Sequence, residues 1–67
     1  MAAGMVRWWN ESRGFGYVFP DGEDGDIRAD RYAITGPGYL SLSEGMRVTF
    51  DIVDGPKGRE ATNIQPA

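Results

Sequence analysis

Two segments of the chain, 26–30 and 47–53, alternate between apolar and polar residues. Because successive side chains of a strand point to opposite faces, this period of two predicts strands that bury one face and expose the other. Segments 5–10, 14–19 and 60–64 are further strand candidates, each next to turn-forming residues such as Gly, Asp or Pro. The pattern therefore predicts five short strands.

A long connection, residues 31–46, separates the third and fourth predicted strands, and a single helical turn is expected at its start, over 31–34. Five short strands with one long connection fit a small closed barrel better than an open sheet, because closure removes exposed strand edges. We therefore predict an all-β fold with a single domain, residues 1–67. The expected core consists of Val6, Val18, Ile27, Ala29, Ile34, Leu42, Val48, Phe50, Ile52 and Ile64.

The second predicted strand carries large rings on the face that is expected to be exposed. If Val18 is buried, the alternation turns Phe15 and Tyr17 outward, and exposed large rings usually mark a binding surface. Trp8 lies on the preceding strand, with arginines nearby that can meet phosphates. Bases stack on such rings with roughly 1–3 kcal/mol per base, whatever their sequence. On the pattern alone, Trp8 and Phe15 as ordinary core residues remain an alternative.

Composition narrows the possible functions. The chain has no cysteine and no histidine, so it lacks thiolate ligands and the commonest general base and metal ligand. We therefore expect no enzymatic activity, no metal and no cofactor. Hydrophobic content of 40% suits a globular core, and the absence of a long apolar run predicts a cytoplasmic protein without a membrane segment.

The net charge of the chain is unusual for a nucleic-acid-binding protein. Seven basic and ten acidic residues give a net charge of -3, whereas nucleic-acid-binding domains usually present a basic surface. Affinity for phosphate must then come from the local placement of charge, and stacking must supply more of the binding.

Several motifs resemble those of the bacterial cold-shock proteins. The segment Arg13-Gly14-Phe15-Gly16-Tyr17-Val18 resembles the family's first ribonucleoprotein motif, Lys-Gly-Phe-Gly-Phe-Ile, and Arg7-Trp8-Trp9-Asn10 resembles its Lys-Trp-Phe-Asn. Segments 33–39, 42–50 and 55–58 are also similar to the family in the same order. The resemblance covers essentially the whole chain.

This resemblance implies a five-stranded antiparallel OB-fold barrel that binds single-stranded DNA or RNA. Such a protein would act as an RNA chaperone or as a regulator of transcription or translation, with loose base preference, and we expect a monomer. By position, the residues that match stacking positions are Trp8, Phe15, Tyr17 and Tyr39. Those that match polar contacts are Arg7, Arg13 and Lys57, and Asn10 closes the first motif of the same surface.

The third predicted strand departs from the family. Where the family typically has Asp-Val-Phe-Val-His-Phe, this chain has Asp26-Ile27-Arg28-Ala29-Asp30-Arg31. Arg28 and Arg31 could stack on bases and attract phosphate, which would retune a site that includes Asp30. Alternatively, the loss of two rings and the gain of a carboxylate weaken binding by a few kcal/mol. In a third interpretation the face contacts a protein, or Arg28, Asp30 and Arg31 form a surface ion network.

Strict alternation places Val6 and Trp8 on the same face, although Val6 is expected inside the barrel and Trp8 outside. We predict a twist or β-bulge near Trp8 that resolves this conflict. For Trp9, core packing or partial exposure is as plausible as ligand contact. The acidic run 21–26 has the composition of a calcium loop but not its spacing, because the twelfth position is Tyr32 and not Glu. A solvated hairpin loop is expected there.

Overall fold

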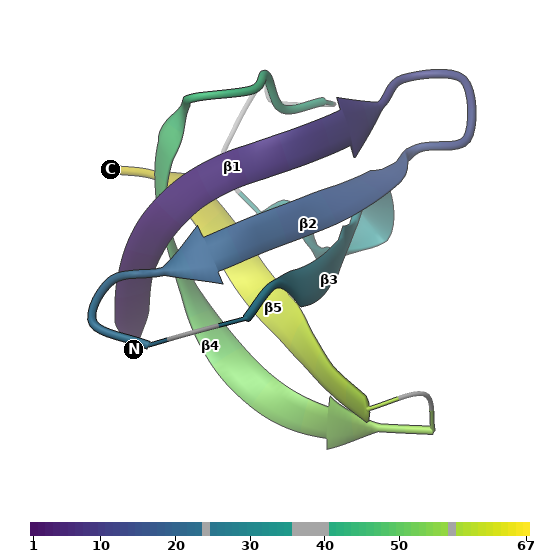
Figure 1. Ribbon diagram of the computed structural model, residues 1–67. Coiled ribbons are helices and arrows are strands. Elements are labelled where there is room, and N and C mark those ends of the chain that lie inside the picture. Colours follow the sequence, from purple (N-terminus) through teal and green to yellow (C-terminus); the bar gives the residue numbers. More distant parts are fainter. Residues whose placement is uncertain (24, 36–40, 57) are drawn as a thin grey trace.

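The computed structural model describes residues 1–23, 25–35, 41–56 and 58–67, and its strands close into a barrel (Figure 1). The elements are β1 (Ala2–Asn10), β2 (Phe15–Pro20), β3 (Ile27–Asp30), the 3₁₀ turn η1 (Arg31–Ala33), β4 (Arg47–Gly55) and β5 (Gly58–Pro66). The five predicted strands and the helical turn after the third are confirmed. None of the helical segments among the described residues is long and apolar enough to cross a membrane.

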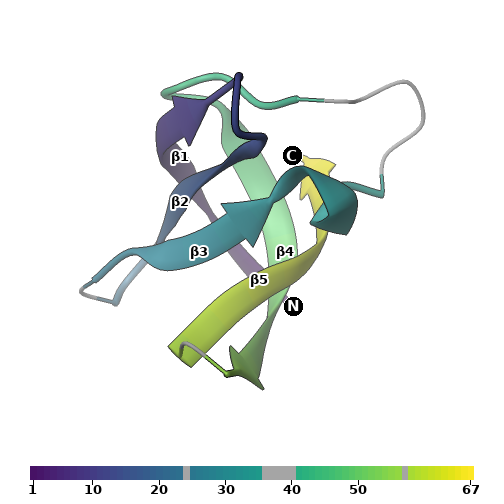
Figure 2. The same cartoon turned by 90° about the vertical axis from the view of Figure 1, so that its right-hand side faces the viewer.

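The strands follow one another around the barrel in the order β1-β2-β3-β5-β4 (Figures 1 and 2). Neighbours are antiparallel except for β3 and β5, which run parallel. A ring with an odd number of strands cannot alternate in direction throughout, so closure of five strands forces at least one parallel contact. The predicted five-stranded barrel is therefore correct, and the expectation that it is antiparallel holds for every pair but this one.

Three strands, β1, β4 and β5, extend at least two residues beyond their predicted ends, because backbone pairing continues past the apolar segments. β1 begins at Ala2, since residues 2–5 pair with β4, and β5 runs on to Pro66, which lies opposite Val48. β4 likewise continues to Gly55, opposite Gly58.

The barrel interior holds most of the expected core. The buried apolar residues are Val6, Val18, Ile27, Ala29, Leu42, Val48, Phe50, Ala61 and Ile64. Ile34 and Ile52 were expected to be buried but are only partly so, whereas Ala61 was not anticipated. A register shift between Thr49 and Asp51 interrupts the alternation of β4 just before Ile52, and Ile34 lies beyond η1, outside the named strands.

The predicted irregularity near Trp8 is present in β1. The register with β2 shifts between Val6, opposite Val18, and Trp8, opposite Tyr17. Val6 is 1% exposed and Trp8 is 40% exposed, so the shift turns the two side chains to different sides of the barrel wall. The bulge therefore places Trp8 on the outer surface, beside the rings of β2.

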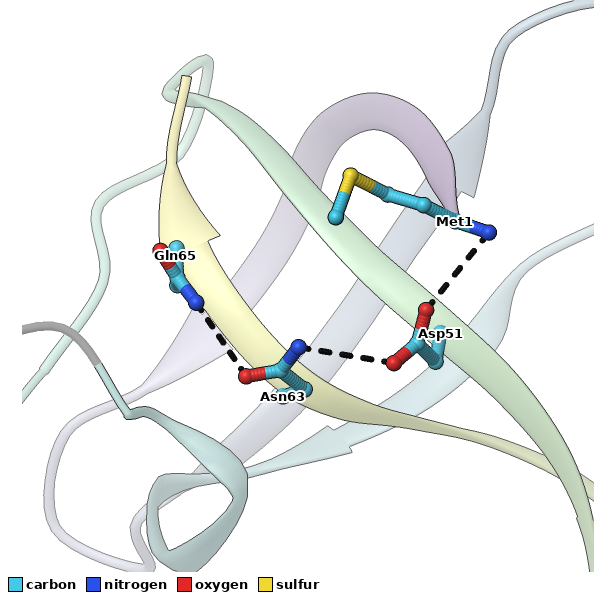
Figure 3. Close-up of polar contacts among 4 residues, drawn as sticks. All are labelled: Met1, Asp51, Asn63 and Gln65. Atoms are coloured by element: carbon cyan, nitrogen blue, oxygen red, sulfur yellow. Dashed lines mark hydrogen bonds and ion pairs between the residues drawn. The ribbon is translucent and has the colours of Figure 1, made fainter.

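A network of polar side chains connects β4 to β5. These two strands lie behind β1 and β2 in Figure 1. The Asn63 side chain donates to an Asp51 carboxylate oxygen at 3.4 Å and accepts from Gln65 at 3.2 Å, and the amino group of Met1 lies 3.6 Å from the other Asp51 oxygen (Figure 3). The Thr35 hydroxyl also donates to Asn63, at 2.7 Å. Asn63 has a φ of 53°, so these contacts hold it in a conformation that residues other than glycine adopt rarely.

Candidate nucleic-acid interface

Three rings cluster on the outer face of β1 and β2. The ring centroids of Trp8 and Phe15 are 5.6 Å apart, those of Trp8 and Tyr17 are 5.9 Å apart, and those of Phe15 and Tyr17 are 6.2 Å apart. Phe15 meets the other two nearly edge to face, at interplanar angles of 69° and 82°. Such edge-to-face pairs are favourable, so the rings hold one another in place before any ligand binds. We refer to Trp8, Phe15 and Tyr17 as the ring face.

The strand register explains this clustering. Trp8 lies directly opposite Tyr17, and Phe15 is two residues earlier on the same side of β2. Between them, Gly16 allows β1 to approach closely, because a Cβ at this position would overlap the carbonyl oxygen of Trp8. The glycine in the sequence motif is therefore a packing requirement of the ring face.

Arg28 joins the ring face from β3. It lies opposite Tyr17 in the strand register, and its guanidinium carbon is 4.4 Å from the centroid of the Phe15 ring. A guanidinium this close to an aromatic face is attracted by about 0.5–1 kcal/mol where it is exposed. Arg28 therefore covers the Phe15 ring with a flat cation, and this surface can itself stack on a base.

The Asp30 side chain stabilises the backbone of η1, the turn that follows β3. It lies opposite Phe15, and its carboxylate accepts a hydrogen bond from the Tyr32 amide at 3.1 Å, which caps η1. No ion pair within the described part of the chain joins Asp30 to Arg28 or Arg31. The surface ion network considered for this strand is therefore not formed.

The arginines fall into two groups. Those that pair with carboxylates in residues 1–23, 25–35, 41–56 and 58–67 are Arg7 with Asp26, Arg47 with Asp21, and Arg59 with Glu23. Arg13, Arg28 and Arg31 take part in none of these ion pairs. Within the described residues, the arginines outside these ion pairs therefore lie in the turn before β2, on β3 and in η1, next to the strands that carry the ring face, although the chain as a whole has a net charge of -3.

Asp21 and Arg47 form an ion pair that shifts the pKa of both groups. The Arg47 guanidinium donates to the Asp21 carboxylate, which holds the pKa of Asp21 below its ordinary value and raises the pKa of Arg47. Both side chains are exposed, and they tie the turn after β2 to the start of β4. This pair is structural, and neither residue belongs to the ring face.

Other predicted site residues have mainly structural contacts. The Asn10 side chain accepts from the Arg13 amide at 3.1 Å and so closes the β1–β2 turn. Arg7 lies over the Phe19 ring at 5.5 Å and pairs with Asp26 at 3.5 Å, so it is not part of the ring cluster. Trp9 packs against the core. The predicted contacts Tyr39 and Lys57 lie outside the described residues.

Tyr32 is an exposed ring beside this surface that the sequence interpretation did not include. It lies in η1, is 88% exposed, and has the Arg31 guanidinium carbon 5.8 Å from its ring centroid. A single tyrosine in a connection has no periodic pattern around it, so the only indication in the sequence that this turn belongs to a binding site was the neighbouring Arg31.

Across the described ranges, no group of three or more acidic side chains is arranged to hold a metal ion.

A closed five-stranded barrel with a ring cluster on its outer face, and with Arg28 over one of these rings, is typical of a small nucleic-acid-binding β-barrel. Residues 2–67 match the model of the 'Cold-shock' DNA-binding domain family. The chain belongs to this family and is a nucleic-acid-binding protein of the cold-shock type.

Individual proteins to which the chain is similar include two bacterial cold shock proteins. The chain is 48% identical to the cold shock protein ScoF of Streptomyces coelicolor over 67 residues, covering 100% of both chains. It is 44% identical to the cold shock protein CspD of Bacillus subtilis over 64 residues, covering 96% of each. A solved structure of Drosophila Unr, CSD456, has a TM-score of 0.81 at 14% identity, over 98% of this chain and 26% of the Unr chain. This last likeness concerns the fold alone.

Proposed function

We propose that the ring face binds single-stranded DNA or RNA, with bases stacked on Trp8, Tyr17 and the Phe15–Arg28 pair. The observation that carries this proposal is the mutual packing of three rings on an outer surface, where Trp8 remains 40% exposed. Single strands fit such a surface, because their bases are free to stack on the rings.

Phosphate binding is assigned to the arginines that lack carboxylate partners in the described part of the chain, Arg13, Arg28 and Arg31. Three neutralised phosphates on a single strand correspond to a slope of about -2 in log K against log salt. Such a modest slope is consistent with binding in which stacking supplies much of the affinity.

The third strand is retuned for binding in this proposal. The guanidinium of Arg28 supplies a flat surface over Phe15, and the carboxylate of Asp30 is engaged by the backbone of η1. The alternative, a diverged barrel that serves as a protein-interaction or regulatory module, is less favoured, because the ring cluster is intact and the family match spans residues 2–67. We further propose that the protein acts as a cytoplasmic monomer, as an RNA chaperone or a regulator of transcription or translation, without a catalytic role.

Tryptophan fluorescence tests the proposal directly. Trp9→Phe leaves Trp8 as the single tryptophan, and this variant is titrated with oligo-dT, with mixed-sequence RNA and with a DNA duplex. We expect both single strands to quench Trp8 and the duplex to quench it weakly. The matched variant Trp8→Phe retains only the core-packed Trp9 and should show little quenching. Absence of Trp8 quenching at high micromolar single strand would disprove the proposal.

A further inference from the structure

The most exposed ring in the described residues does not belong to the ring face. Tyr32 is 88% exposed, compared with 40% for Trp8. A single exposed aromatic residue is not by itself evidence of a site. Three further observations indicate a site at Tyr32: the position of η1, the hydrogen bonds that order it, and the guanidinium beside the ring.

Tyr32 lies in the turn that directly follows the end of β3 nearest Phe15. Phe15 pairs with Asp30, the last residue of β3, and η1 follows without a break as the coiled turn after the β3 arrowhead in Figure 2. The Arg31 amide donates to the Gly14 carbonyl at 2.8 Å, so η1 is attached to the residue just before Phe15. A strand that crosses the ring face and passes Phe15 in this direction therefore reaches η1.

The Arg31 side chain lies between Gly14, the residue before Phe15, and the Tyr32 ring. Its guanidinium covers Gly14 so closely that a Cβ there would come within 3.0 Å of Nε, Cζ and Nη2. The same guanidinium carbon lies 5.8 Å from the centroid of the Tyr32 ring. Gly14 has a φ of 70°, which favours glycine, so both the backbone and the side-chain space at this position suit the arginine that lies over it.

The turn that presents Tyr32 is fixed before a ligand binds. The Asp30 carboxylate accepts from the Tyr32 amide at 3.1 Å, and the Ile34 amide donates to the Arg31 carbonyl at 3.1 Å. An exposed ring on a hydrogen-bonded turn loses little conformational freedom when a base stacks on it, because its backbone is already ordered.

The charge beside the ring indicates what would occupy it. Neither Arg31 nor Arg13 pairs with a carboxylate within the described segments. An aromatic ring next to an unneutralised guanidinium matches a nucleotide, which has a base to stack and a phosphate to neutralise.

We propose that Tyr32 and Arg31 form an additional nucleotide subsite, in which Tyr32 stacks on a base and Arg31 contacts a phosphate of the same bound strand. This inference rests on the proposed function, because it extends the strand already placed on Trp8, Phe15 and Tyr17. It predicts a binding site that is one nucleotide longer at the η1 end than the ring face alone provides.

A length series tests the subsite. The wild-type protein and Tyr32→Ala are titrated with oligo-dT of about four to about ten nucleotides, the range of site sizes for single OB-folds, with Trp8 quenching as the readout. We expect Tyr32→Ala to weaken binding of the longer oligonucleotides by about 5-fold to about 100-fold and to leave the shortest ones unchanged. Tyr32→Phe, which keeps the ring, should match the wild type at every length.

Val53→Ala is the matched control, since Val53 is also exposed but lies on β4. It should bind all lengths like the wild type, and thermal unfolding should be unchanged for Tyr32→Ala because its side chain is 88% exposed. Equal affinity of Tyr32→Ala and wild type at every length would overturn the subsite. A uniform loss at all lengths would also overturn it. Absence of Trp8 quenching in the wild type would instead contradict the proposed function.

Discussion

Replacing Arg28 separates two contributions of its guanidinium, a flat surface over Phe15 and a positive charge. The guanidinium carbon is 4.4 Å from the Phe15 ring centroid, and Arg28 is one of three arginines without a carboxylate partner in the described residues. Arg28→Ala removes both contributions, whereas Arg28→Lys keeps the charge and removes the plane. The two variants therefore predict different results in the same titration.

The salt dependence reports the charge. With three phosphates neutralised, the slope of log K against log salt should be about -2 for the wild type and about -1.4 for Arg28→Ala, while Arg28→Lys stays near -2. The affinity at fixed salt reports the stacking surface. Loss of one stacked base costs roughly 1–3 kcal/mol, so Arg28→Ala should weaken binding by about 5-fold to about 100-fold, and Arg28→Lys by part of this.

Fluorescence titrations with oligo-dT at several salt concentrations measure both quantities. Arg59→Ala is the control, because it removes the same charge from β5, where Arg59 pairs with Glu23 at 3.1 Å. It should leave the slope and the affinity close to the wild-type values. Unchanged or tighter binding by Arg28→Ala would refute the reasoning, since the guanidinium would then only mask Phe15.

Two further predictions concern acidic residues around the β2–β3 turn. Asp26→Asn should tighten oligo-dT binding at low salt by releasing Arg7, which lies 3.5 Å from the Asp26 carboxylate. Glu23→Gln is the control, because it removes the same amount of negative charge. An equal gain in affinity from Glu23→Gln would mean that the change in net charge, and not the release of Arg7, causes the tighter binding. Asp21→Asn should destabilise the protein at neutral pH, because Arg47 lowers the pKa of Asp21 from its ordinary value of 3.8. A lowered pKa contributes stability above pH 3.8 that is lost as the pH falls through the lower folded-state value, so the difference between variant and wild type in urea unfolding should shrink on acidification. A difference that grows in acid would contradict this assignment.

The double variant Arg28→Phe with Asp30→His distinguishes the interpretations of the third strand. In the retuned site that we propose, the change removes the cation over Phe15 and the cap of η1, so binding should weaken. Tighter binding to oligo-dT would instead mean that Arg28 and Asp30 had weakened the site. The measurement is the dissociation constant at one fixed salt concentration, beside the single variant Arg28→Ala.

The sequence by itself determined the strands and the outward direction of the rings on β2. A period of two predicted β3 and β4, and a buried Val18 required Phe15 and Tyr17 to face outward. These inferences succeeded because they depend on local geometry, which an alternating pattern records directly. The conflict between Val6 and Trp8 also predicted the irregularity of β1, since both could not satisfy a regular strand.

Tertiary structure decided how side chains from different strands combine. Arg28 covers Phe15 only because β3 pairs with β2 in the observed register, and the carboxylate of Asp30 is directed to η1 rather than to a neighbouring arginine. Ala61 is buried where β5 lies between β3 and β4, opposite Ala29 and Ile52, and its parallel contact with β3 is one that closure of an odd-numbered barrel requires. The contact of Arg31 with Gly14 attaches η1, and with it Tyr32, to the residue before Phe15, a proximity between segments that no local pattern encodes.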